Sequence, residues 1–292
     1  MATGIVSLGL SVDGQEALSR VLLVVAALVW YVVFAGIVLG GGLEHARSPA
    51  ALTWVAGTGV LGERLSLLGW NHEAAVLLAL AALLWTALVP AVLAHWRTPT
   101  VGTSFLLAVA TESLAVLTSR LALVDGLRSL ALAGFALCAL GILFYAVVLA
   151  RFELHHLLVG RGDQWIAGGA LAIATLACAR CAQAAGVFPG LRGASGALDD
   201  AALALWAAAA LWLVALLVCE ALQRRTRFDE RRWSTVFPLG MYAACSFATA
   251  RVAGVGGLAD FARVWIWLAF AAWLLVAYGS FRQFLVSGSK KS

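Results

Sequence analysis

The chain has 292 residues, of which 63% are apolar and 12% are charged, whereas ordinary globular domains are about half apolar and about a quarter charged. A soluble domain of this size could not bury so much apolar surface, so lipid is the expected solvent for most of the chain. A soluble enzyme, a nucleic-acid-binding domain and a disordered chain are excluded, and the net charge of +5 needs another explanation.

Continuous apolar runs separated by short polar turns predict membrane-spanning helices, each needing roughly 20 residues, along the whole chain. Residues 1–292 then form a single transmembrane domain. The runs do not alternate between apolar and polar residues as barrel strands do, so the predicted fold is all-α. The ten predicted segments are 1–12, 17–42, 52–69, 72–94, 102–124, 127–151, 164–187, 199–223, 234–254 and 259–286.

The first segment is too short to span, because twelve residues rise about 18 Å against a hydrocarbon core about 30 Å thick. Similar fragments begin 54 residues apart, at Met1, Val55 and Val109. This period matches one helical hairpin and predicts a pseudo-symmetric bundle of five hairpins. In that arrangement the first segment is the back half of a first helix, which suggests that the chain begins inside a truncated helix.

The odd-numbered segments are richer in Gly, Ser and Thr, while the even-numbered segments carry bulkier side chains and many tryptophans. Small and polar residues favour buried helix contacts or a wet lumen, and large apolar residues suit lipid. We therefore expect the odd segments inside and the even segments outside. The candidate pore-lining residues are Thr3, Thr58, Thr111, Glu112 and Ser113.

The basic residues predict the orientation. Turns that follow even segments, together with the C-terminal end, carry twelve of them, and turns that follow odd segments carry four. The positive-inside rule places the richer side in the cytoplasm, so both termini are expected there, in a multi-pass protein of the cytoplasmic (inner) membrane. The twelve are Arg47, Arg97, Arg151, Arg161, Arg224, Arg225, Arg227, Arg231, Arg232, Arg282, Lys290 and Lys291.

The other four arginines, Arg64, Arg120, Arg180 and Arg251, lie late in odd segments. Arginine within a membrane is costly unless it faces a cavity or a partner. Two interpretations stay open: a vestibule that attracts anions, or ion pairs and interfacial anchoring, with partners such as Glu63, Glu112, Asp125 and Asp260. For Glu112 we favour a pair with an arginine.

No metal site or cofactor is predicted. Cys178 and Cys181 form a C-x-x-C, but no second pair or histidine completes a zinc site. The adjacent His155 and His156 should point in different directions on a helix, so they are not expected to share a ligand.

The ninth segment contains Pro238, which removes a backbone hydrogen bond and kinks a helix. Phe237 directly precedes this kink, on a helix assigned to the interior. Its ring either packs in the core or forms a hydrophobic constriction, which could gate a pore.

Residues 233–243, Trp-Ser-Thr-Val-Phe-Pro-Leu-Gly-Met-Tyr-Ala, resemble the ninth helix of the tellurite-resistance/dicarboxylate transporter family, which includes plant slow anion channels and malate and sulfite transporters. Residues 1–7 are similar to its first helix and residues 110–117 to its fifth, where glutamine commonly stands at the Glu112 position. The resemblance covers the whole chain. It implies ten helices as five hairpins around a pseudo-fivefold central pore, lined by odd helices. A phenylalanine matching Phe237 occludes that pore, beside Pro238 and Gly240.

We therefore expect an anion channel or transporter without enzymatic activity, in which a small anion moves passively or with protons. The resemblance implies a C4-dicarboxylate, tellurite, sulfite, chloride or nitrate as the anion, and a homotrimer with one pore in each protomer. The expected partners are this anion and the lipid bilayer, with no nucleic acid. A membrane-embedded enzyme and a cofactor-binding bundle without transport stay as alternatives.

Overall fold

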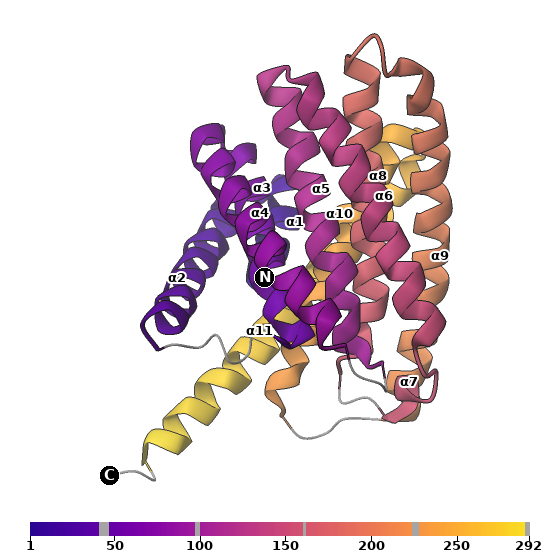
Figure 1. Ribbon diagram of the computed structural model, residues 1–292. Helices are drawn as coiled ribbons and strands as arrows, with labels where there is room; N and C mark the ends of the chain where they lie inside the picture. Colours follow the sequence, from indigo (N-terminus) through magenta and orange to yellow (C-terminus); the bar gives the residue numbers. More distant parts are fainter. Residues whose placement is uncertain (41–46, 97–99, 160–161, 224–227, 290–292) are drawn as a thin grey trace.

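The computed structural model describes residues 1–40, 47–96, 100–159, 162–223 and 228–289, and these residues are almost entirely helical (Figure 1). Short 3-10 helices η2 to η5 precede some of the longer ones, at Pro49–Leu52, Gly102–Phe105, Arg192–Ala194 and Glu230–Arg232. The α-helices are α1 (Ala2–Val12), α2 (Glu16–Gly40), α3 (Thr53–Leu67), α4 (Asn71–Ala94), α5 (Leu106–Asp125), α6 (Arg128–Arg151), α7 (His156–Val159), α8 (Trp165–Val187), α9 (Ser195–Leu222), α10 (Trp233–Ala253) and α11 (Gly256–Ser289).

Eight helices of the described chain are long and apolar enough to cross a membrane. They correspond to eight of the ten predicted segments, with ends that agree to within a few residues. The predicted segments 1–12 and 52–69 are helices α1 and α3, of 11 and 15 residues, shorter than the roughly 20 residues of a span. The multi-pass membrane fold is thus confirmed, while the count of ten spans stays a prediction.

Glycines in the left-handed conformation close four of the turns that join successive helices. Gly14, Gly69, Gly126 and Gly254 have φ between +66° and +87°, a conformation that glycine adopts at little cost after a helix. These turns are tight, so α1, α3, α5 and α10 each pack against the helix that follows. The pair α8 and α9 packs in the same way through a turn of different form.

The helices α1, α3, α5, α8 and α10, called the inner helices below, are also in contact with one another. Helix α1 contacts α3, α3 contacts α5, α5 contacts α8, α8 contacts α10, and α10 contacts α1. Small residues allow this closeness. A methyl group added at Gly240 of α10 would lie 2.8 Å from Ile5 of α1, and one added at Gly62 of α3 would lie 2.6 Å from Leu117 of α5.

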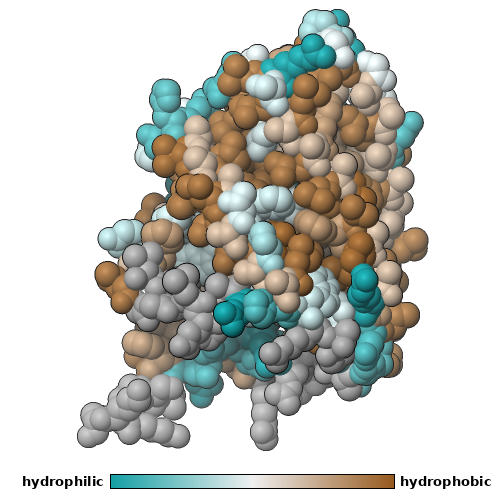
Figure 2. Space-filling model, in the orientation of Figure 1, coloured by the Kyte–Doolittle hydropathy of each residue, from teal (hydrophilic) through white to brown (hydrophobic). Residues whose placement is uncertain are grey.

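The remaining long helices α2, α4, α6, α9 and α11, called the outer helices, carry most of the exposed apolar side chains. The most apolar stretch of α8 is 100% buried, whereas those of α2, α4 and α11 are 17% buried. The predicted division into inner odd and outer even segments is confirmed. Figure 2 shows the result on one face: apolar residues cover the middle of the molecule, and hydrophilic residues gather toward its two ends.

Part of the basic charge that predicts the orientation falls outside the described residues. Of the twelve, these are Arg97, Arg161, Arg224, Arg225, Arg227, Lys290 and Lys291.

Candidate functional site

A cavity of about 600 Å³ lies among the first turns of the inner helices. Each inner helix, or the short 3-10 helix before it, contributes to its wall. The contributing residues include Thr3, Thr53, Thr103, Ile166 and Phe237. We call this space the wide cavity.

Phe237 lies one turn into α10, beside the wide cavity, and its side chain is 1% exposed. The ring is held against α8, because a methyl group added at Gly169 would lie 3.0 Å from it. The same added methyl would lie 2.9 Å from Pro238, which stands inside α10. A glycine on α8 therefore lets the Phe237–Pro238 step of α10 approach closely, while Gly240 serves the contact with α1.

A second cavity, of only about 10 Å³, is lined by residues from the middle of all the inner helices. We call it the narrow cavity. Met241 contributes to its wall one helical turn beyond Phe237, together with Ile5, Val60, Ser113 and Ile173. Because the inner helices pass first the wide cavity and then the narrow one, the two cavities define a candidate axis with Phe237 between them.

An ion pair stands at the far end of this axis. Glu63, which lines the narrow cavity, accepts a hydrogen bond of 2.6 Å from Arg180 Nη2, and both side chains are buried. Arg180 also donates to Gln183, while Glu63 Oε2 and Arg180 Nε have no partner among the described residues. Glu63 belongs to α3 and Arg180 to α8, and α5 contacts both helices from between them. The pair thus joins two helices that are not neighbours.

Arg64 is committed to a different contact. Its side chain is fully buried, with Nη2 2.7 Å from Glu16 Oε1 and Nε 2.9 Å from Ser19 Oγ, both on α2. This arrangement ties α3 to α2, so Arg64 neutralises an acid between hairpins.

The two other predicted arginines are more accessible. Arg120 is partly exposed, donates a long hydrogen bond of 3.3 Å to Ser66, and lies within electrostatic range of Glu63, Arg180 and Arg251. Arg251 is exposed near the end of α10. Arg120, Arg180 and Arg251 therefore share one region at the C-terminal ends of the inner helices. For Arg64 and Arg180, the structure therefore supports the ion-pair interpretation rather than an open vestibule.

The candidate pore-lining residues divide into two groups. Ser113 lines the narrow cavity and Thr3 lines the wide one. Thr58 and Thr111 line neither cavity, and their hydroxyls accept hydrogen bonds from tryptophans of outer helices. The hydroxyl of Thr3 accepts one in the same way, from Trp273, which also lines the wide cavity. Gly59 and Val60 line the narrow cavity on α3 in place of Thr58.

These tryptophan contacts repeat around the molecule, and the sequence, whose even segments were expected to turn their bulky side chains to lipid, did not predict them. In each, an indole N–H on the outer helix of one hairpin donates to a hydroxyl on the inner helix of the next. Trp30 and Trp85 are spaced close to the 54-residue period, and this spacing could have predicted that they make equivalent contacts. The pairs are Trp30–Thr58 at 2.9 Å, Trp85–Thr111 at 2.9 Å, Trp206–Ser246 at 2.7 Å and Trp273–Thr3 at 3.0 Å.

Glu112 differs from its prediction. It is fully buried, and neither carboxyl oxygen has a hydrogen-bond partner among the described residues. Its side chain packs against Gly141 of α6, and its titratable neighbours are the thiols of Cys138, Cys178 and Cys181. The expected pair with an arginine is wrong, because this side chain points from α5 toward Gly141 of α6 and the thiols of Cys178 and Cys181 of α8.

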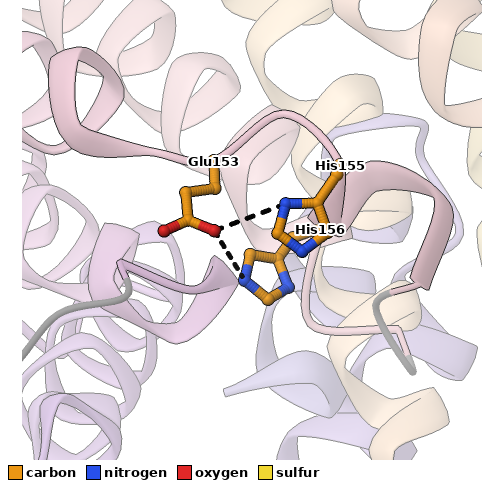
Figure 3. Close-up of side chains that lie close together, drawn as sticks. All are labelled: Glu153, His155 and His156. Carbon is orange, nitrogen blue, oxygen red and sulfur yellow. Dashed lines mark ion pairs between the residues drawn. The ribbon is translucent and has the colours of Figure 1, made fainter.

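The turn after α6 brings together Glu153, His155 and His156 (Figure 3). The two imidazole ring centres lie 4.3 Å apart. The expectation that adjacent histidines diverge assumed a continuous helix. It is wrong here because α6 ends at Arg151 and α7 begins only at His156.

Comparison with known proteins identifies the family. A family model described as SLAC1, voltage-dependent anion channel, matches residues 1–281. The chain belongs to the SLAC1 family. This confirms the relationship that the 233–243 and 110–117 motifs predict. Two uncharacterized membrane proteins of Mycobacterium tuberculosis, from strains CDC 1551 and H37Rv, are each 30% identical to this SLAC1-family chain over 117 residues. The match covers 38% of the chain and 58% of each relative's length.

Proposed function

We propose that this protein moves small anions across a cytoplasmic membrane, through a pore along the axis of the inner helices. The observation that carries the proposal is the position of Phe237, between the wide cavity and the narrow cavity. An aromatic ring at a narrow, apolar point blocks ions and disfavours water. Phe237 is therefore the proposed gate of a closed pore, and Pro238 and Gly240 shape the helix that carries it.

The proposed architecture is ten helices in five hairpins, with pseudo-fivefold symmetry. Three observations support it: the closed series of contacts among the inner helices, the contribution of each to the narrow cavity, and the repeated tryptophan contacts. In this arrangement α1 and α3 are inner helices despite their length. Outer helices and other inner helices pack around them, so neither has to face lipid along a full span.

Charge favours anions at both ends of the proposed pore. The N-terminal ends of the inner helices line the wide cavity together with α2 and α11, and the partial positive charge of a helix dipole is found at such N-terminal ends. Arg120, Arg180 and Arg251 lie at the other end. The Glu63–Arg180 pair is a proposed second barrier, because it joins α3 to α8 beyond the narrow cavity.

Small inorganic anions and C4-dicarboxylates are the proposed substrates, among them tellurite, sulfite, chloride and nitrate. The proposed orientation puts the wide cavity and both chain ends on the cytoplasmic side, following the excess of basic residues in those turns. Passive movement and proton coupling are both compatible with this arrangement of residues.

The Phe237→Ala variant tests the gate. Removing the ring should raise anion flux into liposomes at least about tenfold, since a factor of ten needs a barrier lower by only about 1.4 kcal/mol. The control is Phe270→Ala on the outer helix α11, where a partly buried phenylalanine lines neither cavity. Unchanged flux in folded Phe237→Ala protein, or an equal rise in the control, would contradict the proposal.

A further inference from the structure

A group of potential metal ligands lies in the turn between α6 and α8, away from the two cavities. The side chains of Glu153, His155 and His156 converge on a single carboxylate oxygen (Figure 3). His155 Nδ1 lies 3.3 Å from Glu153 Oε2, and His156 Nε2 lies 3.9 Å from the same atom. The three ligand atoms all lie within 4.8 Å of one another.

The backbone holds this arrangement in place. Phe152, directly before Glu153, is buried against Phe105 with ring centres 5.3 Å apart, and it bridges to Thr100. A tight turn follows, in which the His156 N–H donates to the Glu153 carbonyl at 2.9 Å. The turn brings residues three apart to the same side, so Glu153 and His156 face each other without a long helix.

The distances that place these groups within ion-pair range of Glu153 also fit a shared transition-metal ion. Zinc bonds of about 2.0–2.1 Å in tetrahedral geometry put ligand atoms roughly 3.4 Å apart. The 3.3 Å between His155 Nδ1 and Glu153 Oε2 matches this spacing, and the 3.9 Å between His156 Nε2 and Glu153 Oε2 is longer. His156 Nε2 is shielded from solvent and makes no hydrogen bond among the described residues.

We infer that Glu153, His155 and His156 bind a divalent transition-metal ion such as Zn²⁺. Two imidazole nitrogens and a carboxylate oxygen are common ligands of zinc, and the exposed side of the turn leaves a position for water. In the proposed orientation the site faces the cytoplasm, because it follows Arg151 in a turn on the basic side. Metal binding itself depends on neither that orientation nor anion transport.

The test is a Zn²⁺ titration of the full chain in detergent, purified without a polyhistidine tag, in competition with a chromophoric chelator. One ion should bind per chain. Glu153→Gln, His155→Ala and His156→Ala should each weaken binding at least about tenfold, since even groups that only orient a ligand are worth about 10–100-fold in metal affinity. His72→Ala and His95→Ala, which change histidines of other turns, should leave the affinity unchanged.

A second measurement separates binding from folding. Saturating Zn²⁺ should raise the melting temperature of the unmodified protein, because a ligand that binds only the folded state stabilises it, and should not raise that of Glu153→Gln. Glu153 and His155 are exposed, so their variants should elute and melt normally without metal. Equal affinity in all variants, an equal loss in the His72 control, or no saturable binding would overturn the site.

Discussion

The Glu63–Arg180 pair is the residue-scale feature on which the outer end of the proposed pore depends. Moving two charges out of water often costs more free energy than their mutual attraction provides, so a buried ion pair is weak evidence of a stabilising role. Here the pair also leaves Glu63 Oε2 and Arg180 Nε without partners among the described residues. We propose instead that the pair controls charge along the axis, because an Arg180 that is paired with Glu63 attracts an anion only weakly.

Opposite effects of the two partners test this idea. In a Phe237→Ala background, Glu63→Gln should raise anion flux because it frees the positive charge of Arg180, and Arg180→Gln should lower it because Glu63 is left unneutralised. Both changes should also destabilise the protein, by about 3–5 kcal/mol for a broken buried pair. Flux normalised to folded protein is therefore the measurement.

The control for this experiment is Arg263→Gln. Arg263 forms an ion pair of similar length, 2.7 Å to Asp260, on the exposed surface of α11, where an ion pair contributes little. In the Phe237→Ala background, anion flux through the Arg263→Gln variant should match that of Phe237→Ala alone. Changes of the same sign in Glu63→Gln and Arg180→Gln would refute the proposed charge control.

At the scale of elements, the tryptophan hydrogen bonds connect one hairpin to the next. Each links an outer helix to the inner helix of the next hairpin, and the contact of Trp273 with Thr3 joins the last helix to the first. Between α6 and α8 the described residues show a different contact, with Cys138 Sγ 3.7 Å from Cys178 Sγ. This thiol–thiol contact is a weaker hydrogen bond than the tryptophan contacts, since thiols are poor donors and acceptors.

The Trp85–Thr111 contact can be measured by a double-mutant cycle with Trp85→Phe and Thr111→Val. We expect a coupling free energy of about 0.6 kcal/mol and no more than about 1.7 kcal/mol, the range of hydrogen bonds between membrane helices. Equilibrium unfolding in detergent is the measurement. Trp267→Phe is the control, because Trp267 is 45% exposed on α11. Additive effects of the two changes would contradict a direct contact.

At the scale of the whole molecule, the proposed orientation rests on the distribution of basic residues and can be tested directly. Gly193 lies in the turn before α9, with open space around it, and Arg231 is exposed before α10. In intact cells, a membrane-impermeant maleimide should label Gly193→Cys, and it should label Arg231→Cys only after permeabilisation. The unmodified chain gives the background, because four of its cysteines are buried and Cys219 is partly exposed. The reverse pattern would invert the proposed orientation.

Assembly is the second prediction at this scale. The outer helices expose long rows of apolar side chains, which lipid or neighbouring protomers can cover. The family resemblance predicts a homotrimer, so light scattering of the detergent-solubilised protein should give three chains of 30.6 kDa. A protein mass of one chain would contradict the trimer.

Several features of the fold and site were predictable from the sequence because they depend on composition within one helix. The apolar excess identified lipid as the solvent, and the contrast between segments rich in Gly, Ser and Thr and bulkier segments separated inner from outer helices. Phe237 was identified as a candidate gate by the motif around Pro238. Its position between two cavities depends on all the inner helices together, and no local pattern reports that.

The sequence by itself determined the membrane setting, the helix bounds and the family, because each follows from runs and motifs that are continuous along the chain. Only the tertiary structure decided the partner of each charge. Arg64 and Glu63 are adjacent in sequence, yet one pairs with Glu16 on α2 and the other with Arg180 on α8. Successive residues point about 100° apart on a helix, so neighbours in the chain meet different helices. The distribution of basic residues along the chain predicts an orientation, but only these contacts decide which charges inside the bundle are neutralised.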